Sequence, residues 1–165
     1  MPSAFDTSFA GRTYLPSEPY EVGRETIREF SRAVGDEAGD GLTAPPTFPI
    51  VLSMHAERQV IDDPGLGFDF SRVLHRDQRF DAVRPVRSGD RLVVVIEVLA
   101  AATVDGNDVL TLRGLVREAD GGALVCTTTS TLVSRHAAGE NTAGQSTAGQ
   151  STAGQNASGQ KEAGR

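Results

Sequence analysis

The sequence predicts an α+β fold in which one buried helix packs against a curved antiparallel sheet. Helix-type patterns lie in the first half of the chain, and long strand-type segments lie in the second half. The second half reads as a meander, because Asp105-Gly106 and Asp120-Gly121-Gly122 are hairpin-type turns between those segments. A helix followed by such a meander buries its apolar surface as one layer on the sheet.

The first half contains two predicted helices. Residues 14–22 include two prolines, which predicts an irregular extended segment with a short edge strand. Gly23–Val34 carries apolar residues at helical spacing, and Gly35 is placed to end that helix. After a proline-rich turn, Ile50–Ile61 is apolar on several sides over its first two turns, which predicts a buried helix.

The second half contains four predicted strands, each rich in apolar or β-branched residues. A Pro at position 85 predicts an irregularity after the first of them. The predicted strands are Val73–Val83, Arg91–Val104, Val109–Arg117 and Leu124–Ser134.

Composition divides the chain into a domain at 1–135 and a tail at 136–165. The tail repeats the letters TAGQ and has almost no large apolar residues, so we expect it to be disordered. A net charge of −6 argues against a nucleic-acid partner, and no apolar run is long enough for a membrane helix. The single cysteine excludes an internal disulfide, and no Cys/His cluster suggests a metal. No signal-peptide pattern is visible, which predicts a cytoplasmic protein.

Five collinear strings carry a resemblance to a known family. Together they resemble the N-terminal group of MaoC-like dehydratases, including the non-catalytic subunits of actinobacterial (3R)-hydroxyacyl-ACP dehydratases and uncharacterised streptomycete relatives. The strings are YEVGRETIREFSRAVGD (20–36), APPTFP (44–49), VLHRDQRF (73–80), RPVRSGDRL (84–92) and TLVSR (131–135).

The resemblance implies a hot-dog fold, a long central helix wrapped by an antiparallel sheet, with Thr47–Ile61 as that helix. It also implies that two such domains pair edge to edge, with an acyl chain in a tunnel near their interface. An acyl-ACP or acyl-CoA substrate is implied, and no cofactor is expected.

Catalytic members of the wider family carry a string resembling G-D-x-N-P-x-H, whose Asp and His act together on the water that is added or removed. A dehydration needs both groups in one small volume, because a hydroxyl leaves while an α-proton is removed. Here Asp36 takes the Asp position and Gly41 stands where the His is expected. The loop that follows is also shorter, so the catalytic pair is incomplete. Asp36 is either a vestigial catalytic residue or a polar residue after a helix-stopping glycine.

The same resemblance supplies candidate substrate-binding residues. His75 and Gln78 belong to the VLHRDQRF string, and we expect a structural or tunnel-lining role for them. Pro46, Thr47 and Phe48 lie at the start of the central helix, where backbone N–H groups commonly bind the thioester carbonyl.

We expect the other ionisable residues to be structural or solvated. His55 is expected to be a core or boundary histidine, and His136 to be solvated. Glu57 is the only acidic residue within the predicted helix and is expected to face outward. Arg84, beside a proline, is expected to form a buried ion pair rather than to touch a ligand.

Three functions remain open from the sequence. In the first, the chain is a non-catalytic dehydratase subunit that forms a heterodimer with a hot-dog chain bearing the Asp/His pair. In the second, it is a homodimeric enoyl-CoA hydratase or a hot-dog thioesterase that uses Asp36 or an acid on the helix. In the third, it is an acyl-binding module without chemistry.

Overall fold

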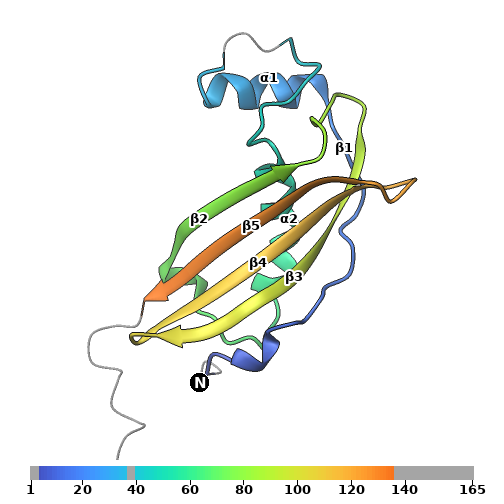
Figure 1. The fold of residues 1–165 in the computed structure, drawn as a ribbon. Coiled ribbons are helices and arrows are strands. Elements are labelled where there is room, and N and C mark those ends of the chain that lie inside the picture. Colours follow the sequence, from blue (N-terminus) through green and yellow to red (C-terminus); the bar gives the residue numbers. More distant parts are fainter. Residues whose placement is uncertain (1–3, 37–39, 136–165) are drawn as a thin grey trace, which may run out of the picture.

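The computed structural model describes residues 4–36 and 40–135, in which a five-stranded sheet curves around one helix (Figure 1). The predicted tail at 136–165 lies outside the described residues. In the described ranges, neither α-helix has the length and apolar character that a bilayer span requires. The elements in chain order are η1 (Thr7–Phe9), β1 (Tyr20–Glu21), α1 (Arg24–Ala33), α2 (Pro49–Ile61), η2 (Phe70–Arg72), β2 (Val73–Ala82), β3 (Arg91–Val104), β4 (Asn107–Glu118) and β5 (Leu124–Arg135).

All neighbouring strands of the sheet run antiparallel, in the order β1-β3-β4-β5-β2. Both predicted hairpins are present, β3 to β4 and β4 to β5. Gly106 follows Asp105 in the first turn, and both have positive φ, as a two-residue hairpin turn requires. The long connection from β2 to β3 carries the chain from one edge of the sheet to the other.

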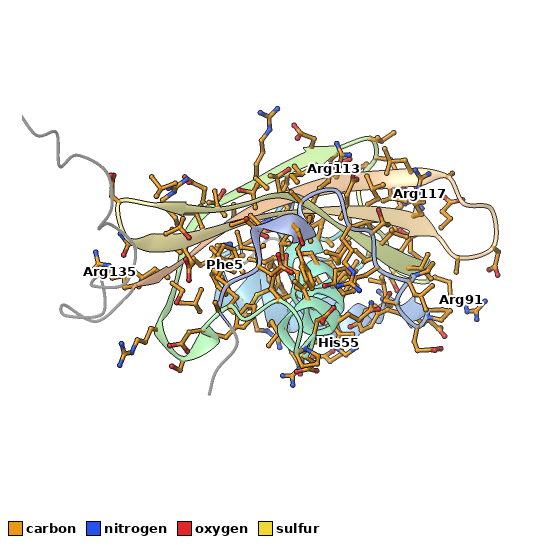
Figure 2. The ribbon with its side chains drawn as sticks, turned by 90° about the horizontal axis from the view of Figure 1, so that it is seen from below. Phe5, His55, Arg91, Arg113, Arg117 and Arg135 are labelled. Atoms are coloured by element: carbon orange, nitrogen blue, oxygen red, sulfur yellow. The ribbon has the colours of Figure 1, made fainter. Side chains whose placement is uncertain are left out.

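The core lies between α2 and the concave face of the sheet. Alternate residues of β3 and β4 are buried there, while the intervening residues face the convex side. Figure 2 shows Arg113 on the convex side and His55 on the far side of α2. The largest wholly buried side chains include Phe48 on the helix side and Ile96, Leu110 and Leu112 on the sheet side.

The strap, residues 11–22, covers the free edge of β3. Backbone N–H groups of Gly11, Tyr14 and Ser17 donate to carbonyls of Val98, Ile96 and Val94 at 2.8, 2.8 and 2.9 Å. The predicted short edge strand is the final part of this segment, β1. Because the strap uses the outer hydrogen-bonding groups of β3, this side of the sheet is closed to another strand.

The predicted element order is confirmed, and most predicted bounds agree to within two residues. Helix α1 ends before Gly35, whose φ of 79° suits a glycine. Strand β3 has the predicted bounds Arg91–Val104. The architecture is the α+β, hot-dog arrangement that the sequence predicted.

Candidate functional site

Asp36 lies just beyond α1, on the surface. Its backbone N–H donates to the Ser31 carbonyl at 2.8 Å, and the residue is exposed. Residues 37–39 of the motif string lie outside the described ranges. The structure therefore places the predicted catalytic carboxyl at a helix end, and its catalytic role remains a prediction.

At Gly41, where the family motif has histidine, a side chain would be both strained and crowded. Its φ is 75°, a left-handed conformation that favours glycine. A Cβ atom there would lie 3.0 Å from the Arg24 carbonyl oxygen and 3.0 Å from the Cγ and Nε atoms of Arg28. The backbone conformation and the packing against α1 thus both oppose an imidazole at this position.

An apolar pocket of about 350 Å³ lies at the start of α2. Pro46 and Pro49 line it from the helix side, and Ala82 and Val83 line it from the end of β2. The other lining residues are Thr43, Ala44, Pro45, Arg84, Pro85, Val86 and Cys126. Of the three predicted residues at the helix start, the structure brings only Pro46 to this pocket: Thr47 is exposed, and Phe48 is buried in the core against Phe30.

At the start of α2, backbone N–H groups donate to carbonyls three residues earlier, in tight turns. The N–H of Ile50 donates to the Thr47 carbonyl at 3.1 Å, and the N–H of Val51 donates to the Phe48 carbonyl at 3.0 Å. Pro49, the first residue of the helix, has no N–H to offer. These two amides therefore do not point freely at a thioester carbonyl, as an oxyanion-binding helix start would require.

His75 and Gln78 lie together on β2, away from the apolar pocket. Nε2 of His75 is 2.9 Å from Oε1 of Gln78, so the two side chains form one polar group. Gln78 is paired across the strands with Ser130 of β5. Their predicted role in substrate binding remains a prediction.

Glu57 faces inward, so the expectation that it faces outward is wrong. Its residue is only 5% exposed, and its Oε1 accepts a hydrogen bond of 2.9 Å from the Ser130 hydroxyl. Burial raises the pKa of the Glu57 carboxyl, while the Ser130 hydrogen bond and the nearby His75 act in the opposite direction. Sequence reasoning placed Glu57 on the wrong face of the helix, although its spacing gives a signal: it lies three residues before Val60, which is buried.

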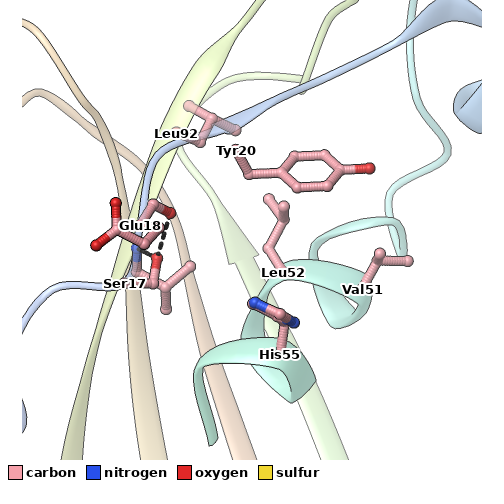
Figure 3. Close-up of a pocket in the computed structure, with 8 residues that line it drawn as sticks. Ser17, Glu18, Tyr20, Val51, Leu52, His55 and Leu92 are labelled. Atoms are coloured by element: carbon pink, nitrogen blue, oxygen red, sulfur yellow. Dashed lines mark hydrogen bonds between the residues drawn. The ribbon is translucent and has the colours of Figure 1, made fainter. Parts of the chain in front are cut away.

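His55 is exposed, which excludes the core position and agrees with the boundary position that the sequence also allowed. Together with Val51 and Leu52 of α2, it lines a small pocket of about 130 Å³ (Figure 3). The strap contributes Ser17 and Tyr20 to this pocket, and β3 contributes Leu92. The helical spacing alone did not reveal that the strap lies beside this part of α2.

The expected ion pair of Arg84 is confirmed. Its guanidinium donates to Asp90 at 2.8 and 3.1 Å and to Glu118 at 2.8 Å. The Arg84 side chain is 33% exposed and that of Asp90 is 18% exposed, so the group is partly buried. Hydrogen bonds from Arg84 and from the backbone N–H of Arg87 hold the pKa of Asp90 below its usual range, against the effect of burial. This cluster joins the β2–β3 connection to the end of β4.

Curated relatives of the chain are found among actinobacteria. The "UPF0336 protein" of Streptomyces avermitilis is 47% identical over 147 residues, covering 81% of this chain and 97% of the relative. The "UPF0336 protein" of Saccharopolyspora erythraea is 44% identical and covers 81% and 93% of the two chains.

Solved structures share the fold. A chain of the C-terminally truncated HadBC (3R-hydroxyacyl-ACP dehydratase) complex from Mycobacterium tuberculosis is 26% identical, with a TM-score of 0.63 over 76% of this chain and 96% of that chain. A MaoC-like dehydratase is 27% identical with a TM-score of 0.66, covering 79% of this chain and 43% of that one. The family described as "FAS1-like, dehydratase domain region" matches residues 8–128. The chain therefore belongs to the FAS1-like dehydratase-region family and has the hot-dog fold of the MaoC-like dehydratases.

Proposed function

We propose that this chain is the acyl-binding, non-catalytic subunit of a cytoplasmic (3R)-hydroxyacyl-thioester dehydratase. In the reverse direction the same complex hydrates a trans-2-enoyl thioester. A second hot-dog chain supplies the Asp/His pair that acts on the water, and this chain supplies part of the wall that holds the acyl group.

The observation that carries the proposal is the strained and crowded backbone at Gly41, where the motif has histidine. A general base needs a side chain at that point of the motif, and the φ of 75° and the 3.0 Å approach of Arg24 and Arg28 oppose one. Asp36 alone does not form a pair that can both release the hydroxyl and remove the α-proton.

Two further features support the assignment of acyl binding to this chain and of catalysis to its partner. The amides of Ile50 and Val51 already donate within the first turn of α2, so these two groups are not free to stabilise a developing oxyanion. The apolar pocket beside that turn, lined by Pro46 and Val83 among others, suits a hydrocarbon chain. The similar structure named as a HadBC (3R-hydroxyacyl-ACP dehydratase) complex supports a partner of the same enzyme class.

The test is hydration of a trans-2-enoyl thioester by the purified chain, by a hot-dog chain with a complete G-D-x-N-P-x-H string, and by the two together. The proposal expects no turnover by this chain alone and an increase in the rate or in the accepted chain length when the two are mixed. A partner variant that lacks its motif histidine is the matched control and is expected to abolish the reaction. Turnover by the isolated chain at the rate of the complex would refute the subunit role.

If the chain is instead an acyl-binding module without chemistry, we expect an acyl ligand in the same pocket. Native mass spectrometry would then detect a bound acyl ligand. Unlike the subunit proposal, this alternative expects no gain in turnover with any hot-dog partner. The reconstitution experiment therefore separates the two functions.

A further inference from the structure

A polar cluster of four residues lies between α2 and the strands β5 and β2. Glu57 of α2 accepts a hydrogen bond of 2.9 Å from the Ser130 hydroxyl, and Ser130 is paired across the strands with Gln78. His75 completes the cluster, because its Nε2 lies 2.9 Å from Oε1 of Gln78 and its charge acts on Glu57. Glu57 is 5% exposed, whereas His75 is exposed, so the polar cluster extends from the interior to the surface.

An irregularity in β2 brings His75 and Gln78 to the same face of the sheet. In a regular strand, residues three positions apart point to opposite faces. The pairing of β2 with β5 shifts between His75 and Asp77, which inserts Arg76 as one extra residue. Such bulges re-aim side chains and are over-represented next to functional sites. Here the bulge places an imidazole beside an amide.

One end of the Gln78 amide has no partner in the described part of the chain. Its Nε2 atom is buried and makes no hydrogen bond there. Turning the amide over would place Nε2 against His75 and would leave Oε1 without a partner instead. An unpaired buried polar group destabilises the folded state, whichever atom it is. The fold thus keeps a polar group at this point that its own described residues do not satisfy.

The neighbours of this amide select the kind of group that can bind to it. An anion could accept from the amide, but the Glu57 carboxylate would repel it. A cation could pair with Glu57, but it has no lone pair with which to accept from the amide. A neutral hydroxyl both donates and accepts, so it fits the amide in either orientation and the Glu57 carboxyl in either protonation state.

Apolar side chains flank the polar cluster on the same face of the sheet. Phe80 and Val73 lie on β2 at either side of it, and both are half-buried against the core. Leu132 is opposite His75 on β5 and is buried. A hydroxyl that binds here therefore has apolar surface on both sides, which matches a secondary alcohol within an aliphatic chain.

The polar cluster and the apolar pocket at the start of α2 lie along the same three elements. The separation is eight residues along the helix, about 12 Å, and four residues along either strand, about 13 Å. An extended chain of about ten carbons covers this distance, because each C–C bond of ~1.5 Å advances a zigzag chain by about 1.25 Å. The residues compared are Pro49 and Glu57 on α2, Ala82 and Gln78 on β2, and Cys126 and Ser130 on β5.

We propose that the polar cluster binds the 3-hydroxyl group of a 3-hydroxyacyl thioester, with Gln78 and Glu57 as its hydrogen-bonding partners. The acyl tail then extends toward the apolar pocket. Exposed His75 turns aside to admit the substrate, a side-chain rotation that takes picoseconds to nanoseconds. The inference rests on the proposed acyl-binding function and deepens it, because it assigns Gln78 as a residue that determines specificity.

Calorimetric binding to the purified full chain tests the ligand class. The probes are three CoA thioesters of equal chain length: 3-hydroxydodecanoyl-CoA, dodecanoyl-CoA and ω-hydroxydodecanoyl-CoA. We expect the first to bind about tenfold more tightly than the second, the gain from one or two net hydrogen bonds. Equal affinities for all three would overturn the inference. Tightest binding of the ω-hydroxy compound would overturn the assignment to the 3-hydroxyl.

Gln78→Leu should remove the preference, so that the ratio of the two affinities falls from about ten to about one. Binding of dodecanoyl-CoA itself should not change. Gln59→Leu is the matched control, since the Gln59 amide already donates to the Leu15 carbonyl at 3.1 Å, outside the polar cluster. Because Gln78→Leu removes an unpaired buried group, it should unfold at no lower denaturant concentration than wild type. A folded Gln78→Leu variant that keeps the preference would contradict the proposal.

The side-chain amide signals of Gln78 provide a direct measurement by NMR. Their absence in Gln78→Leu assigns them. They should shift on addition of 3-hydroxydodecanoyl-CoA and shift much less with dodecanoyl-CoA, since only the first carries the hydroxyl. A glutamine with a purely structural role would respond alike to both thioesters, and that result would count against the proposal.

Failure of this inference can be told apart from failure of the acyl-binding function. If the hydroxylated and saturated thioesters bind equally well, the polar cluster does not read the hydroxyl and acyl binding stands. If neither thioester binds to the chain, the acyl-binding function fails, and the inference that rests on it fails too.

Discussion

The Ser130 hydroxyl donates a hydrogen bond of 2.9 Å to Oε1 of Glu57, which ties the buried helix α2 to strand β5 through a carboxyl group that is only 5% exposed. This contact places an ionisable group inside the layer between helix and sheet. The stability of the fold therefore depends on the protonation state of Glu57, and hence on pH.

Glu57 is expected to lower the stability of the fold as pH rises. Burial raises its pKa in the folded protein, so between its ordinary pKa and the raised value the folded state holds a proton that the unfolded state has released. The free energy of unfolding falls through that interval, by about 1.4 kcal/mol for each unit between the two pKa values. Glu57→Gln keeps an acceptor for Ser130 and should remove this fall.

Denaturant unfolding across the interval, compared between wild type and Glu57→Gln, measures the effect. Other carboxyls such as Asp90, whose pKa is lowered, add stability that is lost as pH falls, but they are common to both proteins. Glu29→Gln, at an exposed position of α1, is the control and should follow the wild-type curve. Parallel curves for wild type and Glu57→Gln would show that the carboxyl is not perturbed by burial.

Gly41→Ala is expected to destabilise the chain more than Gly35→Ala. Both glycines have φ near 75–80°, which costs a residue with a Cβ about 1 kcal/mol. Only Gly41 is also crowded, with atoms of Arg24 and Arg28 at 3.0 Å from a new Cβ, whereas nothing lies within 4 Å at Gly35. Thermal unfolding of the two variants separates backbone strain from crowding.

Gly41→His addresses function at the same position. Restoring the motif residue should lower stability by about 1–3 kcal/mol and should produce no hydratase activity in the isolated chain. A stable Gly41→His variant that hydrates enoyl thioesters alone would show that the position accepts a catalytic histidine.

Arg84→Lys is expected to destabilise the fold by about 1–2 kcal/mol, after allowing for the partial exposure of the pair. A lysine ammonium cannot reproduce the forked contacts to Asp90 and Glu118 that the guanidinium makes. Arg91→Lys is the matched control, because Arg91 and Asp120 are 53% and 78% exposed and their pair contributes little. Equal unfolding midpoints for the two variants would argue that the Arg84 cluster is energetically no different from a surface pair.

Asp36→Asn is expected to change the rate of the reconstituted dehydratase by less than about twofold. The residue is exposed and is not among those lining the apolar pocket, so removing its charge should leave substrate binding intact. The corresponding change in the partner's motif should abolish turnover. A large loss with Asp36→Asn would instead support the homodimeric hydratase or thioesterase that uses this carboxyl.

Val83→Trp probes the pocket at the start of α2. The side chain of Val83 is at the rim, and the residue is 66% exposed, so a larger group there should be tolerated by the fold while filling acyl space. Binding of a long-chain acyl thioester should weaken about tenfold, as expected when apolar contacts worth ~1–2 kcal/mol are lost. Leu42→Trp, at an exposed position outside the pocket lining, should bind like wild type.

The sequence by itself determined the order and nearly all the bounds of the elements. Local patterns suffice there, because Gly35 ends a helix through its positive φ and the hairpin at Asp105 and Gly106 needs only its own two residues. The loss of the motif histidine is likewise a property of position 41 alone. Arg84 could be predicted as an ion-paired residue, since a charge beside a buried turn needs a partner.

Only the tertiary structure decided which elements cover each face of α2. Whether Glu57 faces the core and His55 the solvent depends on which side of α2 the sheet occupies and which side the strap occupies, and both lie far away in the sequence. The crowding at Gly41 arises because atoms of Arg24 and Arg28 of α1 lie 3.0 Å from where a Cβ would be. These features are contacts between segments distant in the sequence, and local propensity carries no information about such contacts.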